Sequence, residues 1–146
     1  MQKDDLDAMN ERINIAINRM NGAYYFWARR RGIQENRLTV LYALSDSDEH
    51  TQAEISCAYL IPKTTVNTVA LKLAQEGTIE LRRAGKNKFM RLSPAGKERV
   101  FAELSELFAA EREAMRRTLE KHGAAFIAAQ EDYAAALEEL LRGDEQ

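Results

Sequence analysis

The chain has 146 residues, of which 45% are hydrophobic and 30% charged, and its formal net charge is −2. This composition is typical of a folded chain of one domain, and no apolar run approaches the ~20 residues that a membrane helix needs. The single cysteine excludes an intrachain disulfide framework, and the polar, acidic N-terminus is not a signal peptide. We therefore expect a cytoplasmic protein with no membrane partner.

The small net charge conceals an uneven distribution along the chain. Residues 62–99 contain nine lysines and arginines against three carboxylates, whereas residues 100–146 contain five against eleven. A local basic excess is either a solvated surface or the contact region for a nucleic acid. The charge alone does not separate these two interpretations.

Apolar side chains recur every three or four residues from Leu6 to Trp27, which predicts one helix over about residues 5–31. Gly32 is a natural end for it. Other apolar residues of this helix lie outside the stripe. A helix that is apolar on more than one side needs more than one neighbour to bury these sides, and a partner chain is one such neighbour. The aromatic cluster that contains Tyr24 and Trp27 is either core or interface, which we favour, or a candidate pocket for a small ligand.

A short helix is expected to end near Ser45, before the acidic loop 45–50. The spacing of the acidic residues and the histidine in this loop matches no metal site, so we interpret it as a solvated loop. Thr51 and Glu54 then form a capping-box pattern that opens another helix. That helix ends near Leu60.

A further helix is predicted from about Pro62, as its first residue, to Glu76, and two helices this close are typical of a helix-turn-helix. Its buried stripe consists of Val66, Val69, Ala70 and Leu73. The opposite face has side chains that suit base edges and phosphates: Lys63, Thr64, Thr65, Asn67, Thr68 and Lys72. Such a face is usually ordinary polar surface. The tight turn before this helix and the hairpin after it favour the interpretation that the face contacts DNA bases.

A basic hairpin follows Gly77, with strands at 78–83 and 88–92 joined by a turn at 84–87. Side chains on it are suited to phosphates or an adjacent minor groove, and the DNA-binding candidates are Arg82, Lys86, Asn87, Lys88 and Arg91. Ser93 and Pro94 then suit the cap and first residue of another helix.

The C-terminal third is predicted to be helical from Pro94 to about residue 142, with an interruption at His122 and Gly123. Its apolar stripes exceed what the small basic lobe covers, so pairing with a second copy is the economical account. The residues expected to pair are Leu6, Met9, Ile13, Ile17, Phe126, Ile127, Leu137 and Leu141.

Catalysis finds little support. The chain has no glycine-rich phosphate loop, no Ser/His/Asp arrangement, no metal-ligand cluster and only two histidines. Cys57 lies in the middle of a predicted helix, where a buried, inert thiol is the default expectation. We predict that the protein is not an enzyme and uses no cofactor or metal.

Residues 51–96 resemble the winged helix-turn-helix of the MarR family of bacterial transcription regulators. The resemblance rests on the Ile55–Ser56 helix, the turn into P62-K-T-T-V-N-T-V, the run L73-A-Q-E-G-T-I-E-L-R-R83 and the closing L92-S-P-A-G96. The long flanking helices extend it to nearly the whole chain. It departs from the family where the wing lacks an Asp-x-Arg motif, leaving its tip contacts to Lys86, Asn87 and Lys88, and where Leu60 replaces a frequent glycine.

The resemblance implies a mainly α fold with a small β-hairpin wing (α+β), in a single domain over 1–146. It also implies a helical dimerisation region at 5–31 and 94–142 and a DNA-binding lobe at 37–93. It further implies a homodimeric repressor on a pseudo-palindromic operator in double-stranded DNA. Such a repressor is either released by a small aromatic effector or works without a ligand, and the sequence leaves both open.

Two other functions remain open from the sequence. One is a winged-helix protein-interaction module without DNA binding, which the missing wing aspartate and the acidic C-terminal third favour. The other is a small enzyme or ligand carrier that uses the aromatic cluster near Trp27.

Overall fold

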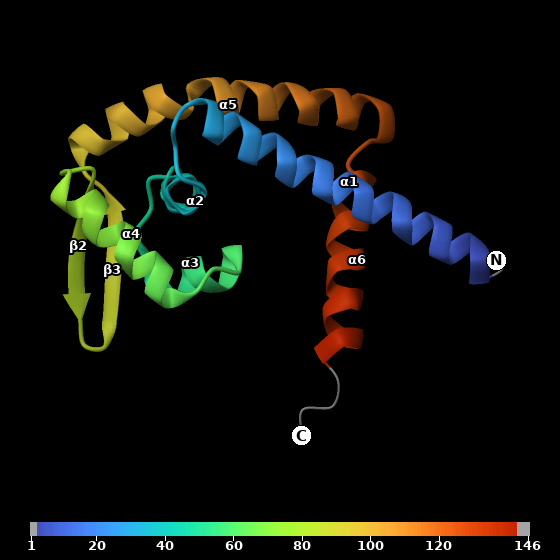
Figure 1. The fold of residues 1–146 in the computed structure, drawn as a ribbon, viewed down its shortest axis with the longest axis horizontal. Helices are drawn as coiled ribbons and strands as arrows, with labels where there is room; N and C mark the ends of the chain where they lie inside the picture. The colour runs from blue at the N-terminus through green and yellow to red at the C-terminus, as the bar shows by residue number, and fades with distance from the viewer. Residues whose placement is uncertain (1–2, 143–146) are drawn as a thin grey trace. The chain divides into compact units, whose positions relative to one another are not determined.

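The structure, a computed structural model, describes residues 3–142 and confirms a mainly α fold with a small sheet (Figure 1). Residues 1–2 and 143–146, at the outer ends of the predicted domain, lie outside the described residues. The elements are α1 (Lys3–Arg30), α2 (Glu35–Ala43), β1 (His50–Thr51), α3 (Gln52–Tyr59), α4 (Lys63–Gln75), β2 (Ile79–Ala84), β3 (Asn87–Leu92), α5 (Pro94–His122) and α6 (Ala125–Arg142). They form two compact units that divide after Glu103, within α5.

The first unit begins with α1, which confirms the predicted long helix. It ends before Gly32, whose φ of +68° is left-handed backbone that glycine adopts without strain. Near this end Trp27 and Ala28 are buried, whereas most of the apolar stripe further up α1 is exposed. The helix is therefore anchored to the unit mainly by its last turns.

The helix-turn-helix consists of α3, a short turn and α4. The predicted capping box is present: the Glu54 N–H donates to Thr51 Oγ1 at 3.1 Å, and the Thr51 N–H donates to Glu54 Oε2 at 2.6 Å. Leu60 follows α3 in left-handed backbone with φ of +52°, a conformation that glycine adopts without the strain that a leucine carries. Pro62 is the N-cap of α4 rather than its first residue, as its extended ψ of 140° requires.

The apolar stripe of α4 fixes this helix to the rest of the lobe. Val66, Ala70 and Leu73 are fully buried, at the spacing of one helix face, and Val69 at the edge of the stripe is half-buried. Around them the core draws on α2, α3, the sheet and the start of α5, through Leu41, Leu44, Ile55, Met90, Leu92 and Val100. This packing leaves the polar face of α4 directed toward the solvent.

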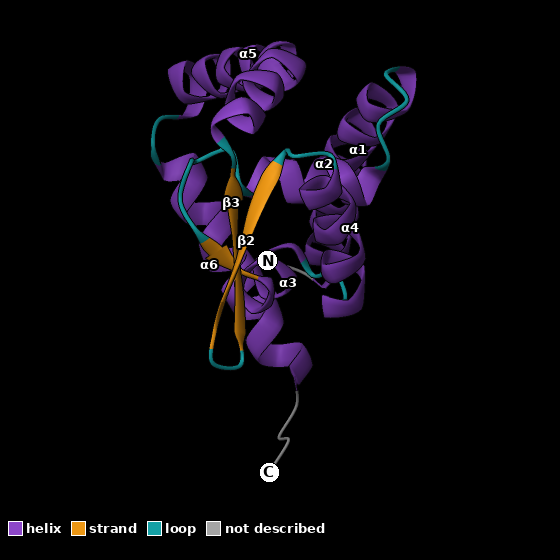
Figure 2. Cartoon of the chain, turned by 90° about the vertical axis from the view of Figure 1, so that its left-hand side faces the viewer, coloured by secondary structure: helices purple, strands orange, loops and turns teal. Residues whose placement is uncertain are grey.

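The sheet has three antiparallel strands in the order β1-β3-β2. Figure 2 shows β2 and β3 as a long hairpin with a narrow turn at one end. Ala84 pairs with Asn87, so Gly85 and Lys86 alone form the turn, and Gly85 has a φ of +59°, as a tight hairpin turn needs. The sequence did not predict β1, because two residues show no alternation, and one of them, Thr51, also caps α3.

Ser93 and Gly96 close the lobe where the hairpin runs into α5. The Ser93 hydroxyl accepts from the Gly96 N–H at 2.9 Å, which confirms the predicted cap, and donates to the Gly77 carbonyl at 2.7 Å. Gly96 lies directly against the carbonyl of the buried Thr78: a Cβ at Gly96 would be 1.8 Å from that oxygen. Only glycine fits at this position.

The second unit contains most of α5 and all of α6, and it leaves much apolar surface uncovered. On the polar side of α5, Arg116 and Arg117 bind the Glu113 carboxylate and hold its pKa at about 2. No residue of the 18-residue α6 is buried. Among residues 3–142, no helix has the length and apolar character to span a membrane.

Cys57 corrects an expectation: it is exposed, not buried. The short helix α3 turns only Ile55 into the core. A residue two positions further along is rotated by about 200° and faces outward.

The contact at Gly96 predicts a sharp difference between two glycine substitutions. Gly96→Ala should lower the free energy of unfolding by about 3 kcal/mol or more, because the new methyl group meets a backbone oxygen that has no room to move. Gly22→Ala should instead add about 0.5–1 kcal/mol, because Gly22 is inside α1 and its Cβ would meet only the Phe26 ring at 3.8 Å.

Denaturant unfolding of both variants beside the wild type measures these effects. Equal midpoints for Gly96→Ala and the wild type would contradict the assigned contact.

Candidate nucleic-acid interface

The polar face of α4 carries the residues that the sequence singled out. Lys63, Thr64, Thr68 and Lys72 are exposed, and Thr65 and Asn67 are half-buried. The helix contains no carboxylate from Lys63 to Gln75. Hydroxyl, amide and ammonium groups on one helix are the groups that contact base edges and phosphates.

Asn67 joins three elements of the lobe. Its Oδ1 accepts from Gln52 Nε2 of α3 and from Lys88 Nζ of β3, each at 2.9 Å. A bidentate contact to adenine uses this same oxygen, so Asn67 would have to share it, while its amide Nδ2 can still donate. Asn67 therefore positions the hairpin against α4 whether or not it touches a base.

The hairpin brings a second group of cations beside α4. Lys86 lies in the tight turn and is exposed, and among residues 3–142 it has no ion-pair partner. Arg91 on β3 pairs with Glu80 on the neighbouring strand, with 2.8 Å between guanidinium and carboxylate. Asn87, the first residue of β3, is exposed. The tip thus presents Lys86 most openly.

Arg82 is held by a carboxylate that sequence reasoning missed. Glu49 receives two hydrogen bonds from this arginine, from Nε at 3.0 Å and from a terminal nitrogen at 2.6 Å. The Arg82 guanidinium also lies 4.4 Å from the centre of the Phe89 ring. These hydrogen bonds lower the pKa of the Glu49 carboxyl and raise the pKa of Arg82.

The strand register explains this pair. Arg82 pairs with Phe89, and Phe89 pairs on its other side with Thr51, so the arginine crosses the central strand over the Phe89 ring toward β1. Glu49 lies two residues before Thr51 and so projects to the same face of the strand. The wing lacks an aspartate of its own, but a carboxylate 33 residues away orients its arginine. Only a prediction of β1 would have indicated this.

The acidic loop is more ordered than a solvated loop. The ring of His50 is 2.8 Å from an Asp46 carboxylate oxygen, and the Asp48 N–H donates to the same side chain at 2.9 Å. Hydrogen bonding by His50 lowers the Asp46 pKa against the opposing effect of burial. Within residues 3–142, no group of three histidine, cysteine or acidic residues has the arrangement of a metal site.

Trp27 and Tyr24, the predicted ligand-pocket residues, have different environments. Trp27 is 92% buried, since 8% of it is exposed, and the guanidinium of Arg31 lies 4.4 Å from its ring centre. Its indole Nε1 is buried with no hydrogen-bond partner among the described residues. Tyr24 is exposed. The structure places these two side chains one helical turn apart on α1.

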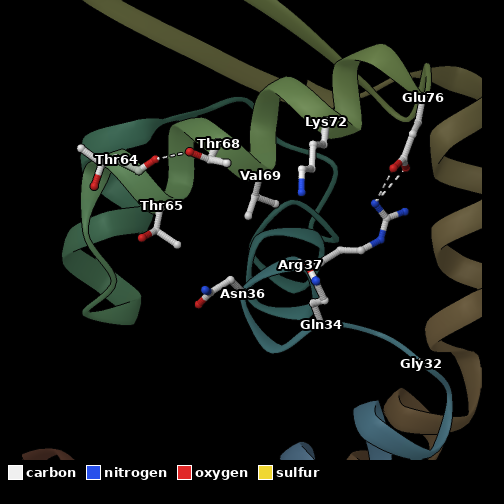
Figure 3. A pocket seen from close by; sticks show the side chains of 10 residues that line it. All are labelled: Gly32, Gln34, Asn36, Arg37, Thr64, Thr65, Thr68, Val69, Lys72 and Glu76. Atoms are coloured by element: carbon white, nitrogen blue, oxygen red, sulfur yellow. Dashed lines mark hydrogen bonds and ion pairs between the residues drawn. The ribbon is translucent and has the colours of Figure 1, made fainter.

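A cavity of about 620 Å³ lies between α2 and α4. We call it the α2–α4 cavity. Figure 3 shows the side chains of both helices directed into it. It is lined by Gly32, Gln34, Asn36, Arg37, Thr64, Thr65, Thr68, Val69, Lys72 and Glu76.

The predicted dimerisation residues are largely uncovered. Leu6 and Met9 are each 50% exposed, Ile13 and Ile17 each 37%. On α6, Phe126 is half-buried, and Ile127, Leu137 and Leu141 are exposed. Apolar side chains at helical spacing that stay exposed in the single chain are typical of a surface that associates with another protein surface.

Comparisons with solved structures agree on one family, although no family model and no curated protein matches the chain. NMB1585, a MarR family regulator from Neisseria meningitidis, is 25% identical, with a TM-score of 0.74 over 99% of this chain and 100% of that one. A MarR family protein from Bacillus stearothermophilus is 13% identical, with a TM-score of 0.64 over 97% and 99%. NadR in complex with 4-hydroxyphenylacetate is 15% identical, with a TM-score of 0.65 over 86% and 91%.

These three structures, of which NMB1585 is a MarR family regulator, share the winged-helix fold with this chain over most or all of its length. The predicted resemblance and fold class are therefore confirmed.

The pairing of Glu49 with Arg82 predicts a pH effect. The folded-state pKa of Glu49 lies below its ordinary value of 4.5, so the pair stabilises the lobe above that pH. The contribution is lost as the pH falls through the lowered pKa. Titration of the Glu49 carboxyl by NMR should give this low pKa in the wild type and a higher pKa in Arg82→Gln.

Arg83→Gln is the matched control, because Arg83 lies next on the same strand and its removal should leave the Glu49 titration unchanged. A Glu49 pKa that is the same in the wild type and in Arg82→Gln would show that the ion pair does not form in solution.

Proposed function

We propose that this chain, which has the fold of the MarR-family regulators, is a sequence-specific regulator of transcription that binds double-stranded DNA. It acts as a homodimeric repressor on a pseudo-palindromic operator. The observation that carries the proposal is the outward face of α4, free of carboxylates and bordered by a cationic hairpin.

In this proposal the N-terminal half of α4 enters the major groove. Thr64 and Thr68 are exposed there. The hydroxyl of each is suited to a base edge, and the methyl group of each is suited to a thymine methyl group. The Thr68 hydroxyl donates to the Thr64 carbonyl at 2.9 Å, so it is left to accept from a base. Asn67 adds its amide donor, and Lys63 and Lys72 neutralise phosphates.

The hairpin supplies contacts that do not depend on sequence. Lys86 at the turn reaches a phosphate or the adjacent minor groove, together with Asn87. Lys88 and Arg82 are already oriented by Asn67 and Glu49, so less freedom is lost when they meet DNA. Arg91 is shared with Glu80 and contributes mainly long-range attraction.

The homodimer is supported by apolar surface that one chain leaves uncovered. A helix such as α6, with no buried residue and with leucines and isoleucine exposed, is poorly stable until another surface covers it. Burying such a side chain contributes about 1.5–3 kcal/mol. Two lobes on one dimer then meet half-sites about one helical turn, ~34–36 Å, apart.

A small aromatic effector is the remaining part of the proposal. NadR, a protein of the same fold, binds 4-hydroxyphenylacetate. The buried indole Nε1 of Trp27 has no acceptor among the described residues, and an oxygen of a phenol or carboxylate would provide one. Because Trp27 is the single tryptophan, unchanged fluorescence on titration with 4-hydroxyphenylacetate would count against this ligand.

DNA binding is tested by fluorescence anisotropy on the DNA upstream of the protein's own gene, against a scrambled duplex, at several salt concentrations. The wild type should prefer the upstream DNA and show a steep salt dependence. Thr64→Val should lose about 1 kcal/mol on the upstream DNA only, because the variant keeps shape but loses the hydroxyl. Lys86→Ala should weaken binding to both duplexes alike. It should also reduce the slope of log affinity against log salt concentration, the salt slope, by about 1.

Weak binding without salt dependence on every duplex would remove the regulator proposal and favour the protein-interaction module. Equal losses on both duplexes for Thr64→Val would remove base reading by this residue.

The dimer is tested by light scattering. Ile17→Glu should convert the dimer into a monomer, because it places a charge in the exposed apolar stripe of α1. Arg19→Glu, an exposed substitution on the same helix, should leave the mass unchanged. A monomeric wild type at micromolar concentration would contradict the homodimer.

A further inference from the structure

The α2–α4 cavity opens on the same face of α4 that is proposed to read DNA. Four of its lining residues, Thr64, Thr65, Thr68 and Lys72, are proposed DNA contacts. The opposite wall comes from the start of α2 and the connector before it, with Gln34, Asn36 and Arg37. None of these three was singled out from the sequence.

The chemistry of the cavity suits an anion. Arg37 and Lys72 bring two positive charges and Glu76 one negative charge, so the lining carries a net positive charge. Figure 3 shows the Lys72 ammonium and the Arg37 side chain directed into the space between the helices. The amides of Gln34 and Asn36 add hydrogen-bond donors, and Gln34 caps no helix amide with its side chain.

Arg37 is held at the edge of the cavity by Glu76. A terminal nitrogen of its guanidinium lies 2.8 Å from one carboxylate oxygen and 3.1 Å from the other. Both side chains are partly exposed, at 25% and 44%. Exposed pairs of this kind contribute little to stability, so an incoming anion can share or replace the Glu76 carboxylate at small cost.

We propose that the α2–α4 cavity is a seat for a backbone phosphate of the bound duplex, with Arg37 as its principal ligand and Lys72 as the second cation. This inference rests on the proposed function and adds a contact outside the helix-turn-helix and the wing. When α4 enters the major groove, the strand that borders that groove passes the flank of α4, and α2 forms the wall of that flank.

The seat fixes register rather than sequence. A phosphate gives no information about the base that it carries, so Arg37 acts on every duplex alike. Glu76 competes with the phosphate for the same guanidinium. Removal of its charge should therefore strengthen DNA binding through Arg37.

The test is a double-mutant cycle on DNA affinity, with the upstream and scrambled duplexes and a salt series. Arg37→Ala should weaken binding on the order of tenfold on both duplexes and reduce the salt slope by about 1. Arg37→Lys should keep the slope. Glu76→Gln should tighten DNA binding about threefold, because the phosphate then no longer has to replace one weak exposed ion pair. This gain in affinity should disappear in the Arg37→Ala background.

Arg117→Ala is the matched control, because it also removes an arginine paired with a glutamate, on α5. It should leave the slope unchanged. Thermal unfolding of every variant shows whether a loss of binding comes from loss of the fold.

Methylphosphonate substitution, which removes the charge of one phosphate at a time, identifies the bound phosphate. Substitution at one phosphate position should weaken DNA binding by the wild type and leave DNA binding by Arg37→Ala unchanged. A wild type that binds DNA, with unchanged affinity and slope in Arg37→Ala, would overturn the seat and leave the proposed function intact. A wild type without salt-dependent binding would overturn both.

Discussion

The contact between the Asn67 amide oxygen and its two donors fixes the geometry on which the candidate interface depends. Gln52 donates to this oxygen from α3 and Lys88 donates to it from the hairpin, so one side-chain atom of a half-buried residue joins α3, α4 and the hairpin. A helix reads a groove and a hairpin reaches the backbone only if their spacing is constant. Asn67 sets that spacing, while the buried stripe of α4 sets the depth of the helix in the lobe.

Charge on this lobe is arranged by carboxylates that lie outside α4 or at its C-cap. Glu49, Glu80 and Glu76 each hold one arginine at the edge of the interface. The lysines of α4 and of the turn at Lys86 have no such partner among residues 3–142, and in the proposed function they contact phosphates. The lobe thus combines arginines held by carboxylates with lysines that no carboxylate holds among residues 3–142, although the overall charge of the chain is negative.

Much of the fold could be predicted from the residues. The stripe that ends at Trp27, the capping box at Thr51 and the glycines after α1 and α4 gave correct elements within one or two residues. The pattern failed where contacts are distant or elements are short: β1 has two residues, and the Glu49–Arg82 and Arg37–Glu76 pairs span 33 and 39 positions. Cys57 was placed wrongly because an eight-residue helix has too little periodicity to define its inner face.

The central claim is that this lobe recognises a particular sequence in duplex DNA. The most direct measurement is selection of bound duplexes from a random pool by the full chain, followed by sequencing. The account predicts enrichment of a pseudo-palindrome whose half-sites are about one helical turn apart, as two copies of α4 in successive major grooves require. A pool that remains random after several rounds would contradict sequence-specific recognition by this chain.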